Sequence, residues 1–171
     1  MFGFKDRNRD AHKKSADEST QLLVAPGTEI SYKSSLINKY VDDHSKIKVL
    51  FNEALTAVQQ ADSKQLLKKL HDIQIALRKH LLDEELNLYI YLRHCYTGDK
   101  HHQELINKFK RRSKKVGTEV FGFISKISQP ENTIEYDEAF LTELLAIGNM
   151  LETLLESEEK HLYTIYRSPF S

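Results

Sequence analysis

The stretch His80-Leu-Leu-Asp-Glu84-Glu-Leu-Asn-Leu-Tyr89 decides how this chain folds. His80 and Glu84 are four residues apart, so on an α-helix they lie one turn apart on the same face. That face is otherwise apolar and runs through Leu66, Leu70, Ile73, Leu77, His80, Glu84, Leu88 and Tyr91. Two ionisable side chains therefore point into a predicted core, where a polar group without a partner costs about 2–7 kcal/mol. The sequence predicts a long buried helix whose polar residues meet partners inside the molecule.

The composition indicates a single all-α domain. The chain has 171 residues, enough for one sizeable core, with only six glycines and three prolines. Its 25 basic and 25 acidic residues balance, which argues against a nucleic-acid binder. Cys95 is the only cysteine, so neither an intrachain disulfide nor a cysteine-based metal cage is expected. The sequence also has no apolar run of about 18 residues and no signal-peptide core, so we expect a cytoplasmic protein without a membrane span.

Four amphipathic helices are predicted over residues 35–60, 63–94, 100–127 and 136–166. The breaks between them are Asp62-Ser63, Thr97-Gly98-Asp99 and Gln129-Pro130. Helices joined by such short connections run antiparallel to their neighbours. The predicted fold is therefore an up-down-up-down antiparallel four-helix bundle over residues 35–168. Residues 1–34 are rich in charged and small polar residues, and they predict a disordered or extended N-terminal leader, with a partner-binding arm as the alternative.

Polar residues interrupt the apolar faces of three predicted helices. His44 lies on the apolar stripe of the first helix, between Tyr40 and Ile47. The end of the fourth helix, Glu158-Glu-Lys-His-Leu-Tyr163, repeats the Glu84-Glu-Leu-Asn-Leu-Tyr89 pattern of the second. Counting from the connecting loops at about 1.5 Å per residue places the polar residues at one height in the bundle. They are His44, His80, Glu84 and Glu158.

Two interpretations of this polar layer follow from the residue types. Imidazole and carboxylate groups together form a mononuclear site for Fe²⁺, Mn²⁺ or Zn²⁺. In the alternative, the layer holds no metal, and each histidine forms a hydrogen bond with a glutamate. The cofactor is therefore iron, manganese or zinc at a partial site, or none.

These motifs resemble the hemerythrin-like (HHE cation-binding) family over about residues 36–166. The resemblance implies a four-helix bundle that holds a carboxylate-bridged di-iron centre, with oxygen binding, oxygen or redox sensing, metal handling or regulation as functions. It places His44, His80, Glu84 and Glu158 at ligand positions. Leu154 stands where the fourth helix of the family usually carries a histidine, and the third helix has Ser113 at this height. We therefore expect a reduced or vestigial site without reversible oxygen binding.

A second, looser similarity concerns residues 147–158, which are similar to the Rsd/AlgQ anti-sigma regulators. Those proteins hold the housekeeping sigma factor through a bundle surface. Two surfaces of this chain predict protein docking. One is an aromatic patch at a bundle end, formed by Tyr89, Tyr91, Tyr163 and Tyr166, since aromatic residues are enriched in binding hot spots. The other is the basic face of the third helix, which carries Arg111 and Arg112. Ordinary packing and a solvated helix face are the alternatives.

Together these patterns predict a non-enzymatic hemerythrin-like regulatory or signalling protein. It would act by binding another protein, with a homodimer as one form of partner. The first alternative is an iron-binding sensor of oxygen or redox state, or a metal-handling protein. The second is a regulator of the Rsd/AlgQ type that binds a sigma factor.

Overall fold

The structure, a computed structural model, describes residues 24–129 and 134–168, and these residues are mostly helical. The elements are α2 (Leu36–Gln59), α3 (Ser63–Asp83), η1 (Glu84–Tyr89), α4 (Ile90–Cys95), α5 (Lys100–Ile127), α6 (Glu138–Ser157), η2 (Glu158–Leu162) and η3 (Tyr163–Ile165). Within these two ranges there is no β-strand, only an isolated bridge between Val24 and Ser31. The predicted all-α class is confirmed.

Two of the helical rods contain a π-helical turn that the sequence patterns did not predict. α3, η1 and α4 follow one another without a break and form one rod from Ser63 to Cys95, in which η1 is π-helical. α6 continues through η2, also π-helical, into the 3₁₀ turn η3. A π-helical turn places i→i+5 hydrogen bonds in an otherwise α-helical segment and is common at functional sites. Both π-helical turns begin at a buried glutamate, Glu84 and Glu158.

Aspartate side chains fix the starts of three helices. Each accepts a hydrogen bond from a backbone N–H in the first turn: Asp62 from Gln65 at 2.9 Å, Asp99 from His102 at 3.1 Å and Asp137 from Phe140 at 2.8 Å. Caps of this kind contribute about 1 kcal/mol each. The helix starts are therefore set by local sequence, which is why the predicted breaks agree with the observed connections.

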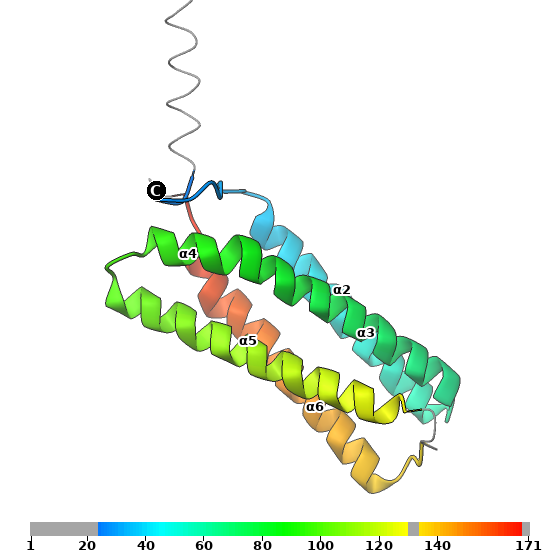
Figure 1. Ribbon diagram of the computed structural model, residues 1–171. Coiled ribbons are helices and arrows are strands. Elements are labelled where there is room, and N and C mark those ends of the chain that lie inside the picture. The colour runs from blue at the N-terminus through cyan, green and yellow to red at the C-terminus, as the bar shows by residue number, and fades with distance from the viewer. Residues whose placement is uncertain (1–23, 130–133, 169–171) are drawn as a thin grey trace, which may run out of the picture.

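The rods lie side by side and enclose a common interior (Figure 1). α2 contacts α3, α3 contacts α5, α5 contacts α6, and α6 contacts α2 more sparsely. The described part of the chain is thus a helical bundle. Its interior is divided into two apolar clusters rather than one continuous core.

A polar layer separates the two clusters on every rod. One cluster is mainly aliphatic and includes Ile47, Leu77, Val116 and Leu155; the other is rich in tyrosine and includes Tyr40, Leu88, Phe109 and Leu162. Between them lie the buried polar residues His44, His80, Glu84, Ser113 and Glu158. The chain passes from the aromatic to the aliphatic cluster along α2 and α5, and in the opposite sense along α3 and α6.

Part of the predicted leader lies against the aromatic end of the bundle. Ala25 is buried, and the backbone N–H of Lys33 donates to the Tyr166 hydroxyl at 2.9 Å. The Tyr32 ring stacks on Tyr166 with centroids 5.0 Å apart. Residues 24–34 therefore form contacts with the domain, and residues 1–23 of the predicted leader lie outside the described residues. Among the described helices, none is both long and apolar enough to cross a membrane.

Candidate metal centre

The four predicted ligands converge in the polar layer. His44 comes from α2, His80 from α3, Glu84 from the start of η1 and Glu158 from the start of η2. All four are buried, and one ligand atom from each lies within 4.8 Å of the others. The predicted convergence of these residues is confirmed. It follows from helical spacing, because each residue occupies a position that an apolar side chain fills one turn above and below.

Hydrogen bonds orient the imidazole of His44. Its Nδ1 lies 2.8 Å from Glu159 Oε1, and since a carboxylate oxygen only accepts, Nδ1 carries the proton in the neutral ring. This tautomer leaves the lone pair of Nε2 directed into the layer. A carboxylate behind a histidine is the usual arrangement for a metal ligand, because it fixes the ring and makes the ligating nitrogen more basic.

His80 faces His44 across the layer. The two Nε2 atoms are 3.0 Å apart, so without a metal one nitrogen must donate a proton to the other. Because His44 Nε2 holds a lone pair, His80 Nε2–H is the donor. His80 Nδ1 then has no hydrogen-bond partner, although Asp43 Oδ2 lies 3.9 Å away. A cation at Nε2 would move the proton to Nδ1, where it faces the Asp43 carboxylate.

In each of the two glutamates, one carboxylate oxygen accepts a hydrogen bond and the other does not. Ser113 Oγ donates to Glu158 Oε1 at 2.6 Å, and Tyr163 Oη donates to Glu84 Oε1 at 2.8 Å. The other oxygen of each carboxylate, Oε2, is buried without a hydrogen-bond partner. Buried carboxylate oxygens rarely lack partners, because the desolvation penalty of an unpaired polar group is large.

The free oxygens face the two imidazoles. Glu158 Oε2 lies 3.6 Å from His44 Nε2, and Glu84 Oε2 lies 3.7 Å from His80 Nε2. With metal–ligand bonds of about 2.1 Å, neighbouring ligand atoms are about 3.4 Å apart in a tetrahedron and about 3.0 Å apart in an octahedron. The observed separations of 3.6 and 3.7 Å are slightly longer than these edges, and the four ligand atoms lie within 4.8 Å of one another, so a small inward movement of the side chains would close the shell around a cation.

Burial disfavours every charged form in this layer. It lowers the pKa of His44 to about 4 and that of His80 to about 3. Burial and the neighbouring Glu158 carboxylate raise the pKa of Glu84 well above its usual range, and burial raises the pKa of Glu158 to about 8. The histidines are therefore neutral at pH 7, and histidinium–carboxylate pairs do not neutralise the layer. The raised pKa values of Glu84 and Glu158 favour their uncharged forms in the metal-free layer, and a bound cation would favour the carboxylate forms that ligate it.

Four further residues support the site through contacts that the sequence patterns do not predict. Glu159 and Asp43 lie behind the two histidines, and Ser113 and Tyr163 donate to the two glutamates. The repeated Glu-Glu-x-x-Leu-Tyr pattern includes Glu159 and Tyr163, so their recurrence was a signal of a role in the layer. Ser113 carries no such signal in the sequence.

The predicted aromatic docking patch is not exposed. Tyr89, Tyr91, Tyr163 and Tyr166 are all at most 7 % exposed. Their hydroxyls find partners inside the molecule: Tyr89 with Ser113, Tyr91 with the carbonyl of Arg167, Tyr163 with Glu84, and Tyr166 with Lys33. Each tyrosine can therefore bury its ring without leaving a polar atom unpaired, and this corrects the prediction that they form a surface.

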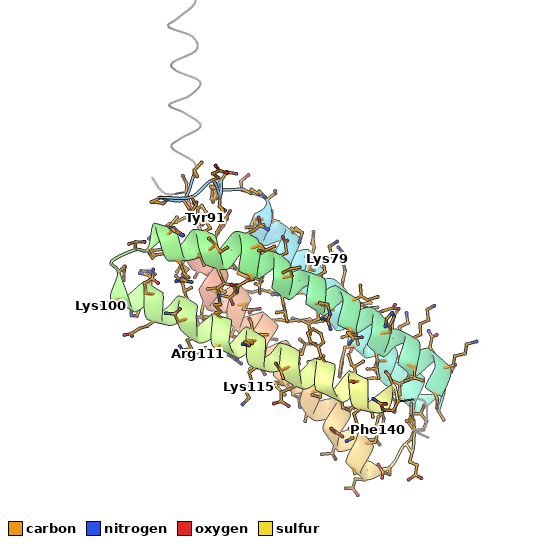
Figure 2. All side chains as sticks on the ribbon, viewed as in Figure 1. Lys79, Tyr91, Lys100, Arg111, Lys115 and Phe140 are labelled. Carbon is orange, nitrogen blue, oxygen red and sulfur yellow. The ribbon has the colours of Figure 1, made fainter. Side chains whose placement is uncertain are left out.

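The two arginines predicted for docking differ in environment. Arg111 lies on the exposed side of α5 (Figure 2). Arg112 is half-buried and donates to Ser157 Oγ at 2.9 Å, so it tethers α5 to the end of α6. Docking of a partner protein at Arg111 or Arg112 therefore stays a prediction.

Comparisons of the chain with protein-family models, with curated proteins and with solved structures found no match.

Proposed function

We propose that this chain is a metal-binding protein of the hemerythrin-like type, in which His44, His80, Glu84 and Glu158 hold one transition-metal ion. The observation that carries the proposal is the pair of buried carboxylate oxygens without partners, Oε2 of Glu84 and of Glu158, facing two imidazole nitrogens. A metal-free layer leaves these oxygens unsatisfied, whereas a cation would bind both of them together with the Nε2 atoms of His44 and His80.

The proposal includes the finer fold, an up-down-up-down four-helix bundle. The alternating direction of the rods between the aromatic and aliphatic clusters supports it. The donor set of two imidazoles and two carboxylates suits Fe²⁺, Mn²⁺ or Zn²⁺. A bound ion supplies positive charge and, for iron or manganese, a one-electron redox couple.

The role that we propose is sensing or metal handling with a regulatory output. The four ligands come from three rods, so loss of the ion would release a link between α2, the α3–η1 rod and the α6–η2 rod. Such a change in helix packing is a signal that a partner protein could read. Asp43 and Glu159 would hold the imidazoles in the ligating orientation throughout.

The test is the metal content of untagged protein, purified with and without air and measured by plasma mass spectrometry together with an absorption spectrum. About one metal ion per chain that survives dialysis supports the proposal. A Glu84→Gln Glu158→Gln variant should lose the ion, while His71→Ala, which removes an exposed histidine of α3, should keep it. Metal-free wild-type protein that also fails to take up Fe²⁺, Mn²⁺ or Zn²⁺ would refute it.

A further inference from the structure

We propose that Tyr163 is a fifth ligand of this centre, and that through its phenolate oxygen the site holds a trivalent ion, Fe³⁺. This inference rests on the proposed metal site and specifies its ligand set and its preferred ion. Tyr163 is buried, with 4 % of its surface exposed, and lies where η2 passes into η3.

The Tyr163 hydroxyl lies close enough to the proposed ligand atoms to bind the same ion. Tyr163 Oη lies 2.9 Å from His44 Nε2 and 2.8 Å from Glu84 Oε1. These separations are within about 0.2 Å of the edge of about 3.0 Å expected between neighbouring ligand atoms in an octahedral shell. The His44 and Tyr163 rings stack with their centroids 5.5 Å apart.

The π-helical turn η2 explains how a tyrosine reaches this point. Tyr163 follows Glu158 by five residues, the spacing that a π-helical turn brings onto one face. Glu84 and Tyr89 have the same spacing across η1. The Tyr89 hydroxyl, however, contacts Ser113 Oγ at 3.2 Å and no proposed ligand, so the chain contains its own matched control.

Charge balance selects the trivalent ion. As a ligand set, two carboxylates and two imidazoles together bring two negative charges to a bound ion. A phenolate adds a third negative charge, and a buried centre is most stable when its net charge is zero. When Fe³⁺ binds, an Fe–O bond forms, the phenolic O–H bond breaks and the proton leaves to solvent; a bound cation is charge enough to deprotonate a ligating hydroxyl.

The experiment loads the full chain with ferric nitrilotriacetate, removes unbound iron by gel filtration, and measures iron content, visible absorption and resonance Raman spectra. The wild type should show a phenolate-to-iron charge-transfer band with enhanced tyrosine ring vibrations. Tyr163→Phe should lose this band, and Tyr89→Phe should keep it. Zn²⁺-loaded protein should be colourless.

The outcomes separate this inference from the proposed site. Bound iron without a charge-transfer band, or a band that persists in Tyr163→Phe, would overturn the role of Tyr163 and leave the metal site intact. Wild-type protein that binds no metal would overturn both. If Tyr163→Phe does not fold, wild-type and Tyr89→Phe proteins grown on ring-deuterated tyrosine decide between the two matched tyrosines, because the enhanced vibrations must be present and shifted in both if Tyr163 is the ligand, and absent from Tyr89→Phe if Tyr89 is.

Discussion

The two helix pairs contribute unequally to the polar layer. The first pair, α2 with the α3–η1–α4 rod, supplies both imidazoles and one carboxylate. The second, α5 with the α6–η2–η3 rod, supplies one carboxylate, while Ser113 and Leu154 occupy buried positions at or near the same level. Both pairs share a glutamate at the start of a π-helical turn. The carboxylates and the π-helical turns are therefore common to both pairs, whereas the nitrogen ligands belong to the first pair alone.

Removing the nitrogen ligands of the first pair should have the largest effect on metal binding. His44→Ala and His80→Ala should each abolish stable metal binding, because a single imidazole would remain with the two carboxylates. Ser113→Ala in the second pair removes only the hydrogen bond to Glu158 and should lower metal affinity about tenfold. Titration against a competing chelator measures all three. Equal losses in the three variants would contradict the unequal roles of the two pairs.

A second comparison concerns the pH dependence of the metal-free protein. The pKa of Glu158 is raised from 4.5 to about 8, so its protonated form is favoured in the folded state. Its contribution to stability is therefore fully present below pH 4.5 and is lost as pH rises through 8. The pKa values of His44 and His80 are lowered from 6.5 to about 4 and 3, so their contributions are present above pH 6.5 and are lost as pH falls through these values. Between pH 6.5 and 8, the stability of the metal-free protein should fall because of the glutamates.

Glu158→Gln tests this directly, since glutamine keeps the shape and has no charge. The variant should be more stable than the metal-free wild type at pH 8, on the order of 4 kcal/mol in the free energy of unfolding, and the difference should vanish near pH 4.5. Urea unfolding at several pH values measures it, with Glu152→Gln on the exposed face as the control. A pH-independent difference would show that the Glu158 carboxyl is not protonated in the folded protein.

Helix glycines also distinguish the two pairs. Among the described helices, α5 and α6 contain Gly117, Gly122 and Gly148, while α2, α3 and α4 contain none. A Cβ at Gly148 would collide with the Phe51 ring of α2, whereas at Gly122 it would meet open space. Gly148→Ala should therefore destabilise the protein by about 1–3 kcal/mol through overpacking. Gly122→Ala should stabilise it by up to about 1 kcal/mol through helix propensity. Thermal unfolding of both variants checks the opposite signs.

The smallest expected effect compares the two carboxylates behind the histidines. Glu159→Gln keeps a hydrogen-bond acceptor for His44 Nδ1 but removes the charge, and it should lower metal affinity by at most about tenfold. Asp43→Asn should do less, because Asp43 lies 3.9 Å from His80 Nδ1 and also pairs with Lys39. Isothermal titration with Zn²⁺ measures both. A larger loss in Asp43→Asn would mean that His80 is the more dependent ligand.

The helices and the ligand layer could be predicted from the sequence, because both follow from the spacing of apolar and polar residues. The stripe from Leu66 to Tyr91 is buried as predicted, and capping aspartates set the helix starts. The π-helical turns were not accessible, since a one-residue change in helical repeat leaves no mark in an apolar pattern that tolerates steps of three and four. The tyrosines were misplaced for a related reason: their burial depends on which buried group meets each hydroxyl, and that is a property of the packed bundle.

The complete burial of the layer has a kinetic consequence. His44, Glu84 and Glu158 are 0 % exposed, and the cleft of about 370 Å³ beside the layer is net positive, because Arg78, Lys110 and Lys114 outnumber Glu85 there, and it therefore repels cations. An ion could then leave only when the rods separate locally, with the sparse contact between α2 and α6 as the weakest seam. The rate at which a chelator strips the protein would be set by this opening, so it should level off as chelator concentration rises. The lifetime of the bound ion would thus report on the breathing of the helices rather than on the strength of the metal–ligand bonds.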